Sequence, residues 1–176
     1  NGKLCLMYAY PEIVPYIEGS DVQFLFDNEG NPVSNFTDLE LIRGVIEGKM
    51  VALKYHAEKK GLVPKANGRI LITGGGSKNK EILQIIANVF QKEVNVMQIE
   101  DSASLGAALR AWHGWKSEKE GRLLEFGASF KEFLEERNKN LAAIKPDYKL
   151  KEVYEKLKKL YEKVLPTVSK NIVESE

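Results

Sequence analysis

The sequence predicts an α/β fold in which helices flank a mixed sheet. Short apolar runs of strand length alternate with segments whose apolar residues recur at the period of an α-helix. Their order, strand–strand–helix–strand–helix–strand–helix, is typical of layered α/β domains. Hydrophobic residues make up 43% of the 176 residues, which is enough for one domain with a sizeable core. Strands that are separated by a helix should be parallel, with right-handed crossovers.

Two strands are expected near the start of the chain. Leu4–Tyr10 is a short apolar run that ends at Pro11, and Val22–Phe26 is a second run of strand-forming residues. Residues 27–32, Asp-Asn-Glu-Gly-Asn-Pro, are rich in turn formers and predict a tight turn after the second strand.

The first helix is expected to begin after Thr37. The segment Thr-Asp-Leu-Glu at 37–40 is a capping box, in which the Thr37 hydroxyl accepts from the Glu40 amide and the Glu40 carboxylate reaches back. Gly61 is expected to end the helix. The apolar residues of helical period are Leu41, Ile42, Val45, Ile46, Met50, Leu53 and Ala57.

Two glycines inside this helix indicate a close approach. Gly44 and Gly48 lie four residues apart, hence on one face. Each costs roughly 1 kcal/mol relative to alanine in a helix interior. We therefore expect this face to pack closely against a sheet, with contact to a ligand as the alternative.

The central strand is expected at Ile70–Thr73, where four residues of buried-strand pattern precede three glycines. Ser77 is expected to cap a helix that runs from Lys78 to about Phe90, with its apolar face inward. The strand, glycine-rich turn and helix follow one another directly.

A further strand and helix complete the pattern. Glu93–Ile99 alternates as a strand, and Ser102 is expected to cap a helix over Ala103–Trp115. Small residues (Ala103, Ala107 and Ala111, with Gly106 beside them) form a stripe on this helix. Such a stripe lets a neighbouring helix lie close, and contact with a ligand is the alternative.

The pattern of charged and apolar residues changes after Lys116. Residues 116–121 are charged and are expected to form a loop, and Leu123–Leu141 is expected to hold one or two short helices before Pro146. Lys149–Leu165 is strongly amphipathic and predicts a terminal helix docked through its apolar stripe. The alternative is a basic helix that binds a membrane surface or a partner, although glutamates interrupt its lysines.

The glycine-rich junction is the best candidate for a ligand site. Gly74, Gly75 and Gly76 have no Cβ, so backbone there can approach a ligand, and the following helix N-terminus offers free N–H groups. The alternative is that the glycines only turn the chain. Neither the Walker A pattern nor G-x-G-x-x-G fits. A nucleotide here should therefore place its base and ribose, rather than its phosphates, over the glycines.

The charge and the cysteine content argue against several classes of protein. With 26 basic and 25 acidic residues, the net charge of +1 favours neither nucleic acid nor an anionic membrane, and no apolar run reaches the roughly 20 residues that span a bilayer. Cys5 is the single cysteine, which fits a reducing compartment, so we expect a cytoplasmic protein. His56 and His113 lack ligand-spaced partners, and we expect them at the surface or half-buried rather than at a metal.

These segments, in this order, resemble the C-terminal half of the FGGY family of carbohydrate kinases, two-domain enzymes with the ribonuclease H-like fold of the actin/hexokinase-like ATPases. The resemblance covers roughly residues 37–115. It rests on the following stretches: Glu47-Gly48 in mid-helix, the strand running into Gly74-Gly75-Gly76-Ser77, the early Asn79 of the next helix, and Ser104-Leu105-Gly106-Ala107-Ala108, where the family has Ala-Leu-Gly-Ala-Ala.

Within the family, the chain is most similar to the xylulose kinases of the eukaryotic type. Residues 76–84 and 110–114 and the C-terminal tail with Val153-Tyr154-Glu155 carry this likeness. The resemblance implies an ATPase-fold lobe at residues 1–116 and a helical extension at 117–176 packed on it. It also implies that the partners of the whole enzyme are ATP or ADP with Mg²⁺, and D-xylulose.

The resemblance assigns nucleotide binding to Gly74, Gly75, Gly76 and Asn79. Gly75 and Gly76 would contact the adenosine part of ATP, Asn79 would reach the adenine or ribose with its amide, and Gly74 would serve the turn. For Asn79 the alternative is an exposed residue of the first helical turn. No metal site is expected in this chain.

The family's sugar-binding domain, which also supplies the catalytic Asp and a phosphate-binding Gly-Thr segment, has no counterpart here. None of the chain's aspartates fits the catalytic motif: Asp21, Asp27, Asp38, Asp101 and Asp147. Phosphoryl transfer depends on positioning both substrates around Mg²⁺. We therefore expect no catalytic residue in this chain and no kinase activity from it alone. It opens without Met, which favours a piece of a longer protein.

Two other functions stay open from the sequence. One is part of a kinase for another sugar or polyol, such as ribulose or glycerol, because sugar choice lies mostly in the absent domain. The other is an actin-like module that senses nucleotide or binds a partner without catalysis. If Leu4–Tyr10 and the small-residue helix normally pack on the absent lobe, the chain alone would expose apolar surface and could self-associate.

Overall fold

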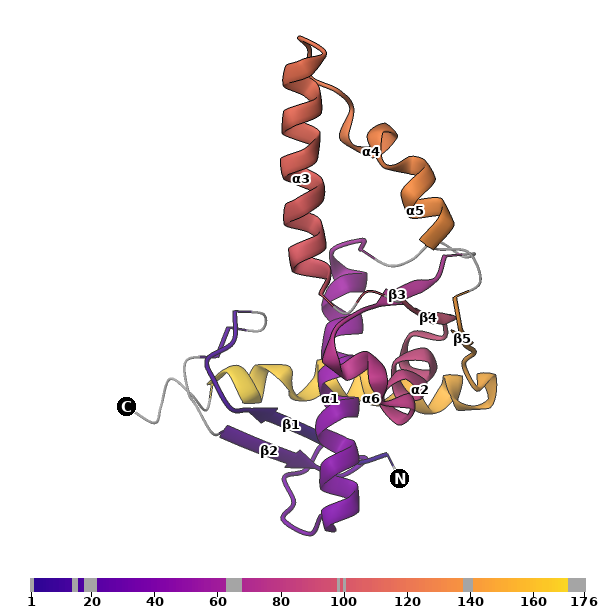
Figure 1. Cartoon of the computed structure of the whole chain (residues 1–176). Coiled ribbons are helices and arrows are strands. Elements are labelled where there is room, and N and C mark those ends of the chain that lie inside the picture. Colours follow the sequence, from indigo (N-terminus) through magenta and orange to yellow (C-terminus); the bar gives the residue numbers. More distant parts are fainter. Residues whose placement is uncertain are drawn as a thin grey trace.

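The computed structural model describes residues 2–13, 16–17, 22–62, 68–97, 99, 101–137 and 141–170. The elements in chain order are β1 (Leu4–Tyr8), β2 (Val22–Phe26), α1 (Asp38–Lys59), β3 (Ile70–Ile72), the 3₁₀ turn η1 (Gly75–Lys78), α2 (Lys80–Phe90), β4 (Val94–Val96), α3 (Ser102–Lys119), α4 (Phe126–Ser129), α5 (Lys131–Arg137), β5 (Ala143–Ile144), the 3₁₀ turn η2 (Tyr148–Leu150) and α6 (Lys151–Lys170). The predicted α/β class is confirmed (Figure 1).

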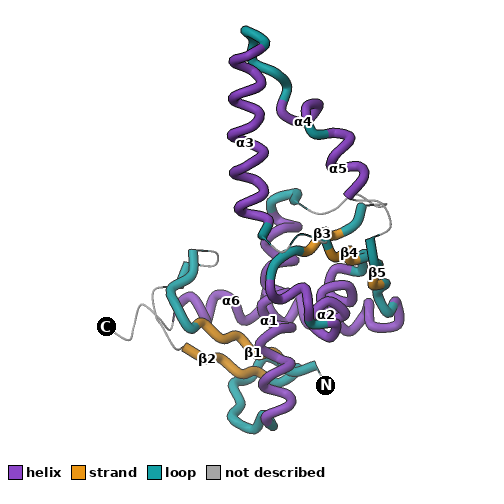
Figure 2. The backbone as a smooth tube through the Cα atoms, in the orientation of Figure 1, coloured by secondary structure: helices purple, strands orange, loops and turns teal. Residues whose placement is uncertain are grey.

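The described strands form two sheets (Figure 2). β1 pairs antiparallel with β2, while β4 lies between β3, to which it is parallel, and β5, to which it is antiparallel. The expected parallel crossover therefore holds for β3 and β4, which α2 connects. It is wrong for β2 and β3, which lie in different sheets. The two-residue strand β5 was not predicted, because a strand this short has no recognisable alternation of apolar and polar residues.

The main core lies where α1 meets β1, α2 and α6. Its largest fully buried side chains include Leu4 and Ile17 from the N-terminal part and Tyr161 and Val168 from α6. A smaller core between α2 and the second sheet contains Leu83, Ala87 and Val94. No helix among the described residues combines the length and the apolar character needed to cross a membrane.

Gly44 and Gly48 let α1 lie directly on β1, as predicted. A Cβ at Gly44 would lie 2.9 Å from the Cys5 Cβ, and one at Gly48 would lie 1.8 Å from the Cys5 carbonyl oxygen. The buried face of α1 is therefore this glycine face. Ile42 (64% exposed) and Leu53 (55% exposed), two of the apolar residues of helical period, point to solvent.

The capping box at the start of α1 is confirmed. The Thr37 hydroxyl accepts from the Glu40 amide at 3.3 Å, and the Glu40 carboxylate accepts from the Thr37 amide at 3.0 Å. At the other end, Lys60 caps the helix and Gly61 follows with a φ of +67°.

Removing this cap gives a first prediction. Thr37→Val keeps the shape of the side chain but loses the acceptor, and we expect the free energy of unfolding to fall by about 1 kcal/mol. Urea denaturation measures it. Thr167→Val, at an exposed position of α6, is the control and should stay within about 0.5 kcal/mol of the parent. Equal losses in the two variants would contradict the capping role.

The C-terminal helix packs with the face that was predicted. Residues of α6 that are buried in the main core are Tyr154, Leu157, Leu160, Tyr161, Val164 and Val168, whereas Val153 is 43% exposed. The helix continues beyond the expected Leu165 and includes Pro166. Because this side of α6 faces α1 and β1, the C-terminal segment is part of the same core.

Ionic contacts join α6 to α1. The buried Lys54 ammonium lies 2.6 Å from the Glu155 carboxylate and donates to the Val89 carbonyl at 3.0 Å. Lys158 contacts Glu58 at 2.6 Å and Glu155 at 2.9 Å. Burial raises the pKa of Glu155, but the two ammonium groups outweigh it and lower this pKa to about 2.

The helix α3 projects from the rest of the molecule, with α4 and α5 beside it (Figure 1). Asp101, not Ser102, caps it, and its helical residues run to Lys119, so the expected loop at 116–121 is wrong at its start. The lysines of this last turn lie over indole rings, Lys116 over Trp112 and Lys119 over Trp115.

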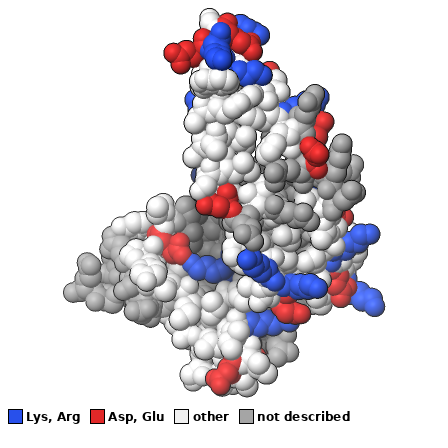
Figure 3. Space-filling view, viewed as in Figure 1, with Lys and Arg blue, Asp and Glu red and all other residues white. Residues whose placement is uncertain are grey.

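The small-residue stripe of α3 is exposed. Ala103, Gly106, Ala107 and Ala111 all face solvent. On the side of the molecule that Figure 3 shows, the middle of the projecting helix is almost free of charge. Among the described residues no helix packs closely on the stripe, so the expected close neighbour is absent there. By contrast, Leu4, Cys5, Leu6 and Tyr8 are buried within the chain itself. The division at residues 116 and 117 stays a prediction, and residue 116 lies inside α3.

Candidate functional site

The glycine-rich junction lies at the carboxyl end of β3, next to the parallel strand β4. Gly74 has a φ of +90°, which only glycine adopts readily, and turns the chain out of the strand. Gly75–Lys78 then forms η1, in which the Ser77 amide donates to the Gly74 carbonyl at 3.1 Å. Ligands of open α/β sheets bind in the crevice at this end of the strands.

Asn79 caps α2, whereas Ser77 does not. The Asn79 Oδ1 atom accepts from the amides of Glu81 at 3.0 Å and Ile82 at 3.2 Å. The Ser77 hydroxyl instead donates to the Gly74 carbonyl at 2.6 Å. The expected cap at Ser77 and the expected start at Lys78 are therefore wrong, because a 3₁₀ turn precedes the helix. No atom of the described residues accepts a hydrogen bond from the Asn79 amide nitrogen.

Gly75 and Gly76 are exposed, and the fold does not require glycine at either. A Cβ at either position would meet no atom within 4 Å, and neither residue has a positive φ. Gly74 is different, because its conformation explains its identity. The junction thus presents a short stretch of bare backbone directly before the N-terminus of an 11-residue helix.

A second loop reaches the same edge of the sheet. The Thr73 hydroxyl donates to the Ile99 carbonyl at 3.1 Å, which ties the end of β3 to the segment after β4. Asp101 begins α3 by accepting from the Ser104 hydroxyl at 2.6 Å and the Ser104 amide at 2.9 Å, and these bonds lower the pKa of its carboxyl group. Because β3 and β4 are parallel, the N-termini of α2 and α3 open at one edge.

The four residues expected to bind nucleotide thus lie together in one exposed turn: Gly74, Gly75, Gly76 and Asn79. Sequence reasoning missed Thr73 and Asp101 as parts of this edge. Asp101 carried a recognisable signal, since an Asp before Ser-Ala-Ser is a strong N-cap. No signal in the sequence identified Thr73, because its hydrogen bond to Ile99 joins residues that are 26 positions apart.

Both acidic and basic side chains lie around the junction, since the exposed Glu81 follows Asn79 in the first turn of α2 and Asp101 lies at the same edge. Lys78 and Lys80 flank Asn79, and both are exposed.

In the part of the chain that the structure describes, no group of three or more His, Cys, Asp or Glu side chains could hold a metal ion. His56 contacts the Tyr161 hydroxyl at 2.9 Å, and His113 is 2% exposed and contacts the Leu124 carbonyl at 2.8 Å. The expectation of a surface or half-buried His113 is therefore wrong.

The remaining aspartates lie away from this turn in structural roles. Asp27 accepts from the amides of Glu29 and Asn31 and closes the turn after β2, and Asp147 caps η2. Asp38 is the first residue of α1. Asp21 falls outside the described residues.

Comparison with known proteins agrees with the resemblance. A family model described as the C-terminal domain of the FGGY family of carbohydrate kinases matches residues 30–115. Xylulose kinase 2 of Arabidopsis thaliana is 36% identical over 149 residues, which cover 80% of this chain and 26% of that protein. Xylulose kinase of Mus musculus is 41% identical over 114 residues, which cover 65% of this chain and 20% of that protein.

Among solved structures, a xylulose kinase from Rhodospirillum rubrum has a similar fold, with a TM-score of 0.59 at 21% sequence identity. The match covers 95% of this chain and 31% of that one. The chain thus spans 20–26% of the length of the curated relatives named above.

Proposed function

Because the chain belongs to the FGGY family of carbohydrate kinases, with its C-terminal domain at residues 30–115, we propose that it is the nucleotide-binding part of a xylulose kinase. The reaction would transfer the γ-phosphoryl group of ATP to D-xylulose, giving ADP and D-xylulose 5-phosphate. The xylulose kinases of Arabidopsis thaliana and Mus musculus support this choice of sugar.

The observation that carries the proposal is the unexplained identity of Gly75 and Gly76. Glycine in an exposed turn costs conformational entropy, and neither φ nor a neighbouring atom requires it here. A ligand that lies against the backbone would require it, because a Cβ would occupy the ligand's place. The flat face of an adenine and its ribose fit such a surface.

Asn79 would serve both the fold and the ligand. Its Oδ1 atom is already engaged as the cap of α2, so the side chain is held in one orientation. Its amide nitrogen, which bonds no described residue, would donate to the adenine or the ribose. Lys78 and Lys80 beside it supply positive charge for the phosphates, against the negative charge of Glu81 in the same turn. Mg²⁺ would arrive with the nucleotide, since it is commonly held through substrate phosphates and one or two carboxylates.

The chain by itself should not catalyse the transfer. The described aspartates serve caps, a turn and the first turn of α1, and Asp101, the one at the edge of the glycine junction, is bonded to Ser104 as the cap of α3. Transfer needs both substrates held in line. We infer that the sugar and the base that deprotonates its hydroxyl belong to a separate lobe, and that closure of the two lobes completes the site.

An assay of Asn79→Ser tests this proposal in the natural gene product. Serine keeps the cap of α2 but lacks the amide donor, so we expect an unchanged melting temperature and about a tenfold higher KM for ATP, the effect of one good hydrogen bond. ATP-dependent phosphorylation is followed with D-xylulose, D-ribulose and glycerol in turn.

Asp147→Ser, at the cap of η2 and away from the glycine junction, is the matched control and should keep the KM for ATP within about twofold, since serine also caps well. Preference for D-ribulose or glycerol would assign another sugar to the same site. Absence of ATP-dependent phosphorylation of all three would favour an actin-like module without catalysis.

A further inference from the structure

A groove along α6, distant in sequence from the glycine junction, has the features of a binding site. Its deeper part is a cavity of about 400 Å³ between the N-terminal segment, the first turns of α1 and the start of α6. Its shallower part, of about 790 Å³, continues along α6 toward Lys163. The two parts share Gly2, Val153 and Leu157, and neither includes any residue of the junction at 74–79. We call these two parts together the α6 groove.

The polar wall of the cavity is built around Arg43. Its Nε donates to a Glu47 carboxylate oxygen at 3.0 Å, and the buried Tyr154 hydroxyl donates to the same oxygen at 2.6 Å. Glu47 raises the pKa of Arg43, and burial together with Glu47 raises the pKa of Tyr154, so the phenol keeps its proton. Although Glu47 anchors it, the Arg43 side chain remains 57% exposed.

A second ion pair of the cavity joins the N-terminal segment to α1. The Lys3 ammonium lies 3.1 Å from the Glu40 carboxylate, donates to the Asn35 carbonyl at 3.2 Å and lies over the Phe36 ring at 5.0 Å. Leu150, Val153 and Leu157 supply an apolar floor to the same cavity. A molecule in the cavity would therefore meet an apolar surface beside two cations, each of which is paired with one carboxylate.

The charge of the whole groove is positive. Lys156, Lys159 and Lys163 line its shallower part, where Glu29 is the one carboxylate among the lining residues described, and Lys163 donates to the Glu29 backbone carbonyl at 2.5 Å. Over the two parts, five cationic side chains stand against three carboxylates. A row of lysines beside a deeper arginine attracts an anion and guides it inward.

We propose that the α6 groove binds a small organic anion, whose carboxylate or phosphate group Arg43 holds while its body lies on the apolar floor. A guanidinium held through its Nε edge is already oriented, so less rotational freedom is lost when an oxyanion binds. The ligand would bridge α1 and α6, and its binding would therefore stabilise the packing of the C-terminal helix.

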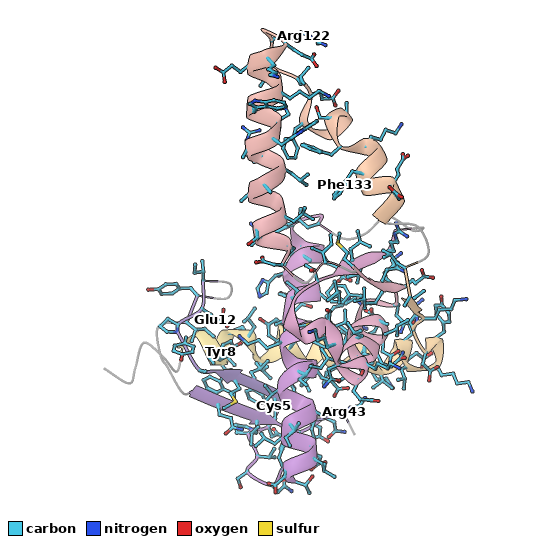
Figure 4. All side chains as sticks on the ribbon, in the orientation of Figure 1. Cys5, Tyr8, Glu12, Arg43, Arg122 and Phe133 are labelled. Atoms are coloured by element: carbon cyan, nitrogen blue, oxygen red, sulfur yellow. The ribbon has the colours of Figure 1, made fainter. Side chains whose placement is uncertain are left out.

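Two variants test the groove by different physical means. Arg43→Gln removes the charge, and Val153→Phe fills the floor while leaving every charge in place. Figure 4 shows Arg43 on the lower part of α1 and Arg122 at the far tip of α3. Arg122→Gln is therefore the matched control for loss of one arginine.

Citrate and pyrophosphate serve as probes in calorimetric titrations of the full chain, and thermal melts verify that each variant is folded. We expect saturable binding of at least one probe by the parent and by Arg122→Gln, with at least tenfold weaker binding by Arg43→Gln and Val153→Phe. A preference for citrate would indicate a carboxylate ligand, and a preference for pyrophosphate a phosphate.

Asn79→Ser, at the glycine junction, should leave these affinities unchanged, which separates the groove from the nucleotide site. The proposal is overturned if the parent binds neither probe saturably up to 20 mM. It is also overturned if folded Arg43→Gln and Val153→Phe bind as the parent does.

Discussion

Substituting alanine for Gly48 is expected to lower the free energy of unfolding by about 3 kcal/mol or more, the upper range for overpacking a core. The added Cβ would lie 1.8 Å from the Cys5 carbonyl oxygen, which is backbone and cannot rotate away. Either α1 must move off β1 or the strand must shift, and both changes open the main core. Urea denaturation measures the loss.

Gly106→Ala is the matched control, since it makes the same change inside another helix. A Cβ at Gly106 would meet no atom within 4 Å, so alanine should stabilise α3 by about 0.5–1 kcal/mol through its higher helix propensity. A lower free energy of unfolding in Gly48→Ala together with a higher one in Gly106→Ala would show that contact with β1, rather than helix propensity, determines the effect at Gly48. A Gly48→Ala protein as stable as the parent would contradict the packing of α1 on β1.

Lys54→Met is expected to cost about 2 kcal/mol at pH 7, the scale for breaking a largely buried ionic hydrogen-bond network. Methionine keeps the length and packing of the side chain. The substitution leaves the Val89 carbonyl without its donor and leaves Glu58 and Glu155 facing Lys158 alone. Since Glu155 is 36% exposed, solvent screens part of the attraction, and the loss is smaller than for a fully buried pair.

The effect of Lys54→Met should depend on pH in a defined direction. Burial raises the pKa of Glu155, and the ammonium groups of Lys54 and Lys158 lower it to about 2, below the ordinary value of 4.5. The stabilisation is therefore complete above pH about 5 and is lost as the pH falls toward 2. The gap between parent and variant should narrow over this interval, down to the part that the Val89 carbonyl contributes.

Denaturant titrations at several pH values measure this narrowing. Lys159→Met, at an exposed lysine of the same helix, should stay within about 0.5 kcal/mol of the parent at every pH. A gap between Lys54→Met and the parent that stays constant from pH 7 to pH 2.5 would contradict the assigned role of Glu155.

Local chemistry explains which elements of the fold were predictable. The capping box at Thr37 and the paired glycines of α1 depend on near neighbours in sequence, and both predictions are confirmed. The face of α6 follows from its apolar period. The cap at Ser77 was wrong because two competing side chains lay within three residues, and the Ser77 hydroxyl bonds the Gly74 carbonyl instead.

Long-range contacts explain most of the other differences. The buried side of α1 is chosen by β1, which needs the glycine face, so Ile42 and Leu53 remain outside despite their hydrophobicity. The strand β5 exists only because β4 offers it an edge. Lys116 and Lys119 extend α3 since both are good helix formers and lie over indole rings.

The position of the candidate site was predictable from the sequence, but its contacts were not. Three glycines between a strand and a helix identify exposed backbone, and the structure places Gly74, Gly75, Gly76 and Asn79 in one turn. The link from Thr73 to Ile99 and the α6 groove could not be inferred, because each joins segments that are distant along the chain.

A titration of the chain with ADP and Mg²⁺, followed through backbone amide resonances, tests the central claim most directly. At 19.8 kDa the chain suits such a measurement, and each glycine amide reports its own position. We expect saturable shifts concentrated at Gly74–Ile82 and at Asp101, with smaller shifts in Asn79→Ser at the same ADP concentration. Saturable shifts confined to other parts of the chain, or no saturable shift up to 10 mM ADP, would contradict a nucleotide site at the glycine junction.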